Sequence, residues 1–295
     1  TVADYVCREW VDEVFVNLPD DAPYPEMLLN QLTEMGAVVH MKLAKTSNLI
    51  GEKKFVERLG IYTVLTTSIN YVTAKQLFMK RALDILGGLV GCLITLILTV
   101  ILGPLIYIQS PGPIFFSQVR VGKNGKKFKI YKFRSMYMDA EERKKELMKQ
   151  NRVKDGMMFK LEWDPRIIGT KKLPDGTIKK GIGNIIRDFS LDEFPQFFNV
   201  LKGDMSLVGP RPERPFFVEK FREEIPRYMV KHQVRPGLTG WAQVNGYRGD
   251  TSIKKRIEYD LYYIENWTMG LDIKILFLTF FKGFVNKLSL IHISE

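Results

Sequence analysis

The first sixty positions alternate short apolar runs with a stretch of helical spacing. Residues 11–19, VDEVFVNLP, form a short apolar run, and residues 37–43, AVVHMKL, form another. Between them, PEMLLNQLTEMG at residues 25–36 repeats its apolar residues at helical spacing and ends in glycine. This pattern predicts a strand, a helix and a strand. Because the first turn lacks a G-x-G-x-x-G sequence, we interpret the unit as a structural α/β module, with a nucleotide-binding half-domain as the alternative.

A much longer apolar run follows at residues 85–108, ILGGLVGCLITLILTVILGPLIYI, and no charged residue occurs from Ile85 through Val119. As a straight α-helix of 24 residues, the run would be roughly 36 Å long, which is enough to cross a hydrocarbon core. We therefore predict a membrane segment, with a buried core helix as the alternative.

Basic residues flank this apolar run on both sides. Lys80 and Arg81 precede it, and five basic residues follow it: Arg120, Lys123, Lys126, Lys127 and Lys129. Because positive charge beside membrane segments stays on the cytoplasmic side, this pattern favours a re-entrant hairpin with both ends on that side. Pro104 would kink the helix, but near its far end rather than in its middle. A spanning helix therefore remains the alternative topology.

Beyond the apolar run, the pattern becomes that of a mixed α/β protein. Turn residues at 110–113 and 123–125 bracket two strand-like runs and predict a β-hairpin near the membrane. The segment DAEERKKELMKQ at residues 139–150 predicts a charged helix that presents a solvated face.

Composition and charge narrow the class of partner. The chain has 295 residues, 45% of them hydrophobic, which excludes a wholly disordered protein. The formal net charge of the chain is +11. Residues 1–79 hold 7 Lys and Arg against 10 Asp and Glu, which gives this segment a net charge of −3, so residues 80–295 have a net charge of +14. The expected partner is thus an anion. Aromatic residues lie in apolar runs rather than on a basic face, which argues against nucleic acid.

Cysteine and histidine usage excludes two further classes of site. Cys7 and Cys92 are far apart, which argues against a disulfide framework and is typical of a cytosolic redox environment. The three histidines lack metal-binding spacing, which argues against zinc. Any acid–base catalysis would then have to be carried out mainly by Asp and Glu carboxylates.

Candidate chemistry is densest between Ile185 and Pro215. Ser190 and Glu193 fit an S-x-x-E capping box ahead of the apolar segment FPQFFNVL, which predicts a helix that begins at Ser190. In that structural interpretation, Glu193 bonds back to the backbone of Ser190 and Asp192 merely suits the helix dipole.

The functional interpretation of the same residues is a site for a metal-bound diphosphate. Arg187 and Arg211 would meet phosphate oxygens two at a time through their forked guanidinium groups. Asp192 would attack phosphorus, whereas Glu193, about 100° further round the helix, would point elsewhere and hold Mg²⁺. Further phosphate candidates come from the segment KFRSM: Lys132 and Arg134.

Five separated motifs in the chain closely resemble those of the bacterial sugar transferases that act on polyprenyl phosphate, the monotopic phosphoglycosyl transferases. In chain order they are KRALDI, SPGPIFFSQVRVGKNGKKFKIYKFRSM, DPRI, SLDEFPQFFNVLKGDMSLVGPRP and RPGLTGWAQVNGYRGDT. The resemblance runs from about Lys80 to Asn286.

The resemblance implies an α/β fold class in four parts. They are a partial Rossmann-like module at residues 1–73, a membrane-embedded helix segment at 74–110, a catalytic domain with interfacial amphipathic helices at 111–286 and a tail at 287–295. The sequence of the tail does not resemble the ending of the family's sequences. One interpretation is that the tail is a cloning or sequencing scar, and we assign it no role. The chain begins at Thr1, so we expect a fragment whose upstream sequence is absent.

For function, the resemblance implies transfer of a sugar 1-phosphate from a UDP-sugar to undecaprenyl phosphate, with release of UMP, at the start of a polysaccharide repeat unit. The family's nucleophile maps onto Asp192 and its Mg²⁺ ligand onto Glu193. Arg187 and Arg211 map onto donors to the nucleotide phosphates. Two displacements through a phosphosugar–aspartate intermediate predict ping-pong kinetics.

The segment after Arg235 resembles the hexose-specific branch of this family, with glucose favoured and galactose next. Three residues there could line the sugar or nucleotide pocket, a structural loop being the alternative: Gln243, Tyr247 and Arg248. The amphipathic stretch at residues 271–284 is expected in the membrane interface, with a core helix as the alternative.

The expected partners are therefore a UDP-sugar, undecaprenyl phosphate and membrane lipid, without nucleic acid, and the oligomeric state is open to a homodimer. The expected location is the bacterial inner membrane, with the catalytic domain on its cytoplasmic face. The rival hypothesis is a catalytically silent membrane scaffold that binds anionic lipid or a partner protein through the +14 surface. It predicts no UMP production and no effect of Mg²⁺.

Overall fold

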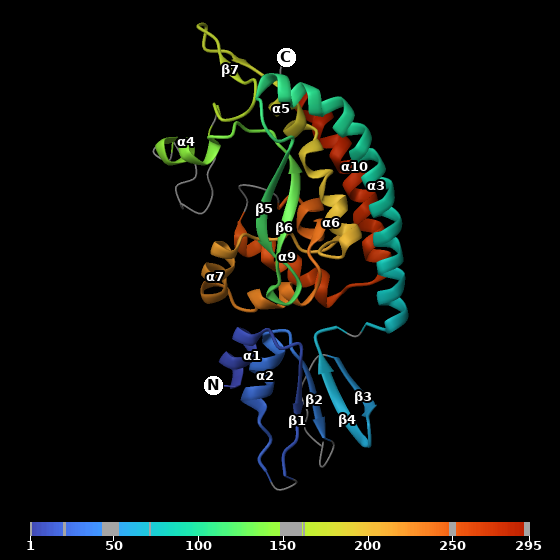
Figure 1. The fold of residues 1–295 in the computed structure, drawn as a ribbon. Coiled ribbons are helices and arrows are strands. Elements are labelled where there is room, and N and C mark those ends of the chain that lie inside the picture. Colours follow the sequence, from blue (N-terminus) through green and yellow to red (C-terminus); the bar gives the residue numbers. More distant parts are fainter. Residues whose placement is uncertain are drawn as a thin grey trace. The chain divides into compact units, whose positions relative to one another are not determined.

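The computed structural model describes residues 2–19, 22–42, 53–70, 72–147, 161, 163–247 and 252–291 (Figure 1). The chain divides into two compact units. Unit 1 comprises Thr1–Arg81, Arg120–Phe128 and Val208–Glu295, and unit 2 comprises Ala82–Val119 and Lys129–Leu207.

The N-terminal part of unit 1 is a small α/β module. Its elements are α1 (Val2–Glu9), β1 (Glu13–Val16), α2 (Glu26–Glu34), β2 (Val38–Lys42), β3 (Lys53–Leu59) and β4 (Tyr62–Ser68). The sheet order is β1-β2-β4-β3, with β1 parallel to β2 and β4 antiparallel to both of its neighbours. The predicted strand–helix–strand unit is confirmed, and the finer Rossmann-like description stays a prediction.

The core of this module lies between its helices and the parallel strand pair. Leu32 of α2 is fully buried and packs with five other buried residues: Val6, Val16, Leu29, Ala37 and Val39. All of these residues except Val6 of α1 are apolar positions of the predicted strand, helix and strand, so burying them fixes the register of these elements.

The C-terminal part of unit 1 is mostly helical. After a 3₁₀ turn at η1 (Lys123–Gly125), its elements are α7 (Pro215–Glu224), η4 (Tyr228–Gln233), β10 (Gly237–Thr239), α8 (Trp241–Val244), α9 (Ile253–Glu265) and α10 (Met269–Ile291). Helix α10 buries Asp272 and Ile275 and exposes an apolar stripe: Ile273, Phe277, Phe280 and Phe281. The predicted amphipathic helix is confirmed, and its place in the membrane interface stays a prediction.

Unit 2 carries the predicted β-hairpin and the predicted charged helix. Its elements include most of α3 (Ala74–Gln109), parts of β5 (Phe115–Val121) and β6 (Lys127–Phe133), then α4 (Ala140–Leu147), β7 (Lys171–Lys172), β8 (Ile178–Lys179), α5 (Ile182–Asp188), η3 (Leu191–Glu193), α6 (Gln196–Lys202) and the start of β9 (Ser206–Val208). Strands β5 and β6 form a two-stranded sheet. Helix α4 exposes Glu141, Glu142 and Arg143, in agreement with the predicted solvated face, whereas residues 148–150 of the predicted helix lie outside the described residues.

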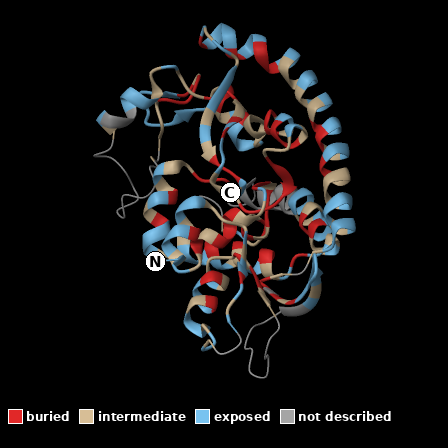
Figure 2. Ribbon diagram, turned by 60° about the horizontal axis from the view of Figure 1, so that its bottom comes forward, coloured by how far each residue is buried: buried red, intermediate tan, exposed pale blue. Residues whose placement is uncertain are grey.

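Helix α3 contains the long apolar run, and it alone among the helices of the described residues is long and apolar enough to cross a membrane. Only 17% of the most apolar 18-residue stretch of this helix is buried inside the protein, which disfavours the alternative of a core helix. Figure 2 shows exposed residues recurring along this helix. The helix continues through Pro104 without a break, and the re-entrant hairpin stays a prediction.

Glycines let the first half of α3 approach its neighbours in unit 2. A Cβ atom at Gly91 would lie 2.1 Å from the ring of Phe197 in α6, and one at Gly88 would lie 2.7 Å from the side chain of Leu201. One turn beyond Gly91, the hydroxyl of Thr95 donates to the carbonyl of Phe194 at 3.1 Å. Close packing against α6 therefore needs residues without side chains at these positions.

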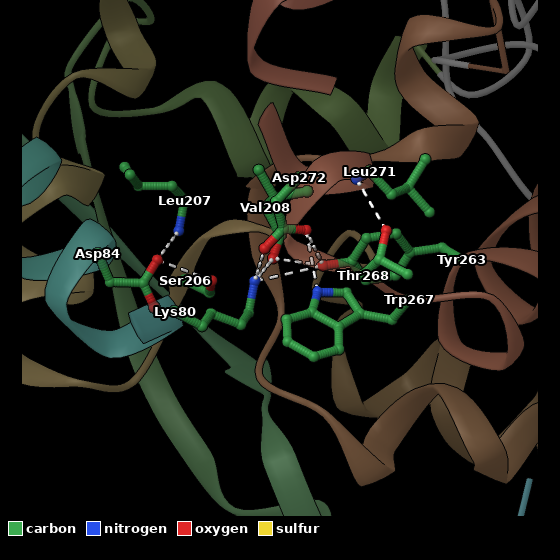
Figure 3. Close-up of polar contacts among 10 residues, drawn as sticks. All are labelled: Lys80, Asp84, Ser206, Leu207, Val208, Tyr263, Trp267, Thr268, Leu271 and Asp272. Carbon is green, nitrogen blue, oxygen red and sulfur yellow. Dashed lines mark hydrogen bonds and ion pairs between the residues drawn. The ribbon is translucent and has the colours of Figure 1, made fainter. Parts of the chain in front are cut away.

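The beginning of α3 is also fixed by a buried carboxylate. Asp84 is 1% exposed, and its Oδ1 accepts hydrogen bonds from the hydroxyl of Ser206 at 2.9 Å and the backbone N–H of Leu207 at 2.8 Å (Figure 3). A buried carboxylate without such donors would be costly, so these bonds tie the helix to β9.

Candidate active site

The Asp-Glu pair lies on a short 3₁₀ turn between α5 and α6. Ser190 precedes it with a left-handed backbone (φ 55°), and Pro195 separates the turn from α6. The side chain of Ser190 makes no capping hydrogen bond, and the backbone N–H of Glu193 donates to the carbonyl of Ser190 at 3.2 Å. The predicted capping box is therefore wrong, because a left-handed residue cannot present the extended geometry that an N-cap requires.

Lys132 of β6 joins the two carboxylates. Its ammonium nitrogen lies 2.9 Å from Oδ2 of Asp192 and 3.2 Å from Oε1 of Glu193. The three side chains are 20%, 16% and 13% exposed, so the cluster is partly shielded from water. The expectation that Glu193 points away from Asp192 is wrong, because both acids reach the same cation. Sequence analysis proposed Lys132 only as a phosphate donor and missed this pairing.

Asn199 of α6 holds the strand that carries Lys132. Its side-chain oxygen accepts from the backbone N–H of Tyr131 at 3.1 Å, and its side-chain nitrogen donates to the carbonyl of Lys129 at 2.8 Å. The residue is fully buried. Since α6 begins three residues after Glu193, these two bonds fix β6 against the segment that carries the acids.

Arg187 lies near the end of α5, exposed to solvent, five residues before Asp192. It influences Asp164 of the DPRI motif. Burial alone would raise the pKa of Asp164, but hydrogen bonds from Arg166 and the positive charges of Arg166 and Arg187 hold that pKa below its ordinary value. An exposed guanidinium beside the Asp-Glu turn suits an incoming anion.

Arg134, the second predicted donor from KFRSM, is buried. Its guanidinium donates to the backbone carbonyls of Ser110 and Pro111, and burial lowers its pKa. These bonds fix the turn that precedes β5. A role for Arg134 in substrate binding stays a prediction.

The remaining predicted residues belong to unit 1. Arg211 lies in the loop after β9 and is half-buried, and Gln243 lies on α8 with its side-chain oxygen buried and without a hydrogen bond. The ring of Tyr247 lies 4.6 Å from that of Tyr259. Arg248 lies outside the described residues. Their contacts with a substrate stay predictions.

The donor set of the acids suits a hard divalent cation. Mg²⁺ in phosphate-transferring sites takes one or two carboxylates together with substrate phosphate oxygens. Asp192 and Glu193 both converge on one cationic group, the Lys132 ammonium, so their oxygens can serve a shared cation. Among the described residues, no group of three or more His, Cys, Asp or Glu side chains could hold a metal ion. A cation at these two carboxylates would therefore also need oxygens from the substrate phosphates.

Comparison with known proteins identifies the relatives of the chain. A galactosyl transferase, CpsE, of Streptococcus agalactiae is 41% identical over 91% of this chain and 57% of its own length. A UDP-glucose:undecaprenyl-phosphate glucose-1-phosphate transferase of Escherichia coli is 45% identical, and an undecaprenyl-phosphate galactose phosphotransferase of Salmonella typhimurium is 39% identical, each over 71% of this chain and 41% of its own length. The chain thus spans about half the length of these relatives.

The family model described as bacterial sugar transferase matches residues 75–286. This range holds all of α3 except its first residue, the β5–β6 hairpin and the turn with Asp192 and Glu193. The chain belongs to the bacterial sugar transferase family, because this match covers well over half of the residues of the chain.

Proposed function

We propose that the chain transfers a sugar 1-phosphate from a UDP-sugar to undecaprenyl phosphate and releases UMP. The observation that carries the proposal is the contact of one ammonium, that of Lys132, with both Asp192 and Glu193. It offsets the repulsion between two adjacent carboxylates and leaves a nucleophile, a cation ligand and a phosphate-binding cation in one place. The names of the relatives support the substrates.

In the first displacement, a carboxylate oxygen of Asp192 attacks the sugar-bearing phosphorus of the UDP-sugar. The bond from that phosphorus to the bridging oxygen breaks, and UMP leaves with the oxygen and the electron pair. The product is an acyl phosphate that joins Asp192 to the phosphosugar. In the second displacement, a phosphate oxygen of undecaprenyl phosphate attacks the same phosphorus and frees the Asp192 carboxylate.

The other residues hold charge during both steps. Glu193, with Asp192, would hold Mg²⁺, which when bound neutralises charge on the diphosphate oxygens. Lys132 is proposed to donate to the phosphate that Asp192 attacks, and its contact with Asp192 supports this role. Arg187 and Arg211 are proposed as donors to the nucleotide phosphates, since a guanidinium fork binds two phosphate oxygens at once.

The acceptor lipid places this chemistry at a membrane. We propose that the exposed apolar residues of α3 and the apolar stripe of α10 contact the inner membrane from its cytoplasmic face. The transferred sugar is proposed to be glucose, with galactose next, because the segment after Arg235 resembles the hexose-specific branch. Transferases for both sugars occur among the relatives. The product would begin a capsule or exopolysaccharide repeat unit.

The test is an assay of UMP release from UDP-glucose and UDP-galactose with undecaprenyl phosphate and Mg²⁺. The Asp192→Asn variant should lose nearly all UMP release, because an amide cannot form the acyl phosphate. Asp188→Asn is the matched control: Asp188 is an exposed acid paired with Lys180 and should be replaceable without loss. Full activity in Asp192→Asn would overturn the mechanism, and a wild-type chain without UMP release would favour the scaffold hypothesis.

A further inference from the structure

The loop with Arg211 begins at a strand residue that is held from two sides. The carbonyl of Val208 accepts from the ammonium of Lys80 at 3.1 Å and from the hydroxyl of Tyr263 at 3.2 Å (Figure 3). Both donors also contact the fully buried carboxylate of Asp272, at 2.6 and 2.7 Å. The ion pair of Lys80 and Asp272, together with Tyr263, therefore holds Val208, which lies two residues before Pro210.

The backbone of the loop itself is bonded on both sides of Arg211. Its hydrogen bonds run from Gly209 N to Thr239 O at 2.9 Å, from Gly237 N to Pro210 O at 2.8 Å, from Arg120 Nη1 to Pro212 O at 3.2 Å and from Val121 N to Glu213 O at 2.9 Å. All these residues belong to unit 1. With two prolines also fixing φ, the main chain around Arg211 has little freedom.

The loop ends in a buried cluster of four charges. Oε1 of Glu213 lies 3.0 Å from Arg256 and 3.6 Å from Lys231, and Lys231 lies 3.2 Å from Asp260. The four side chains are between 2% and 9% exposed. Burial would raise the pKa of Glu213, but the positive charges of Lys231, Arg256, Arg120 and Arg211 hold it below its ordinary value.

Such a cluster is a poor way to gain stability. Removing two pairs of charges from water costs about as much as their attraction returns, and apolar side chains of similar volume often stabilise a protein more. Buried ion pairs do specify one arrangement of the groups that they join. Here they join a loop to η4 and α9 directly after Arg211, whose charge also acts on Glu213.

We propose that Glu213 is a positioning residue for Arg211. Its carboxylate, held by Arg256 and Lys231, fixes the end of the loop so that the guanidinium of Arg211 is presented to the diphosphate of the nucleotide. The inference rests on the proposed function, in which Arg211 binds that diphosphate.

A double-mutant cycle on the full chain tests the proposal. UDP with Mg²⁺ is the probe, and its Kd is measured by calorimetry for the wild type, Glu213→Gln, Arg211→Ala and the double variant. We expect Glu213→Gln to weaken UDP binding about tenfold in the wild type, and by less than twofold once Arg211 is absent. Glu219→Gln, at an exposed acid on α7, is the matched control and should leave the Kd unchanged.

Equal effects of Glu213→Gln with and without Arg211 would overturn the inference, since a merely structural role acts independently of the guanidinium. If Glu213→Gln fails to fold, Glu213→Asp keeps the charge and should show the same dependence on Arg211 with a smaller shift. UMP release from UDP-glucose, measured in parallel, tests the proposed function separately. A cycle that is additive while UMP release is intact contradicts the positioning role alone.

Discussion

The ammonium nitrogen of Lys132 lies 2.9 Å from Oδ2 of Asp192, although sixty residues separate them in the chain. The contact joins β6 of the hairpin to the 3₁₀ turn after α5, and Asn199 holds the same strand from α6. The proposed nucleophile is therefore oriented by a cation on another element rather than by the helix that follows it. Charge-assisted hydrogen bonds of this kind are stronger than neutral ones.

Replacing Lys132 with Met should lower kcat/KM for the UDP-sugar about 10- to 100-fold. A hydrogen bond to a charged group contributes about 1.5–3 kcal/mol, and the two carboxylates would be left to repel each other. Steady-state UMP release gives the value. Lys129→Met, at an exposed lysine three residues earlier on β6, is the control and should change activity less than twofold. Equal activity of the two variants would contradict the proposed role.

Glu193→Gln should raise the Mg²⁺ concentration needed for half-maximal UMP release, because an amide replaces one of two carboxylates that can share the cation. Chelation of the metal should abolish UMP release from the wild type. A titration with Mg²⁺ at saturating UDP-sugar measures the shift. An unchanged Mg²⁺ requirement in the variant would show that Glu193 does not bind the metal and only pairs with Lys132.

The elements of this chain were predictable wherever one segment contains its own periodic pattern. The β1–α2–β2 unit, the apolar helix α3 and the β5–β6 hairpin all follow from local spacing. The same reasoning failed at Ser190, because S-x-x-E is compatible with a cap only when the backbone is extended, and here it is left-handed. Local sequence does not encode that choice.

Long-range pairing was beyond sequence analysis for a different reason. The contact between Lys132 and the acids, and the buried cluster around Glu213, each join residues that are far apart in the chain. No periodicity links such positions, so they appear only when packing brings their elements together. By contrast, Asp192 and Glu193 were found because two adjacent acids stand out beside arginines in one short segment.

Gly91→Ala should destabilise the packing of α3 against α6. The new Cβ would lie about 2.1 Å from the ring of Phe197, so ring and helix must separate, and overpacking of this kind costs about 1–3 kcal/mol. The gain in helix propensity from Gly to Ala, about 1 kcal/mol, offsets only part of that cost. Leu93→Ala, at a position 62% exposed, is the control. Thermal unfolding in detergent should show a lower Tm for Gly91→Ala than for Leu93→Ala, and the reverse order would contradict the close approach.

His232 should make the protein less stable as the pH falls below about 6.5. Burial, then the charge of Lys231, lowers its pKa to about 3, while a backbone hydrogen bond at Gly122 and the charge of Glu213 oppose the shift. The rings of Trp10 and Tyr228 pack edge-on against it, each at 5.4 Å between centroids.

Between pH 6.5 and 3 the unfolded chain therefore binds a proton at His232 that the folded chain does not, and the free energy of unfolding falls by up to about 1.4 kcal/mol per pH unit. His232→Phe keeps a ring between Trp10 and Tyr228 but removes the titrating group. Other groups titrate in both proteins and cancel in the comparison. Chemical unfolding at pH 7.5, 6 and 5 should therefore show the wild type losing stability relative to His232→Phe as the pH decreases. A difference between the two proteins that stays constant over this range would show that His232 titrates alike in the folded and unfolded states.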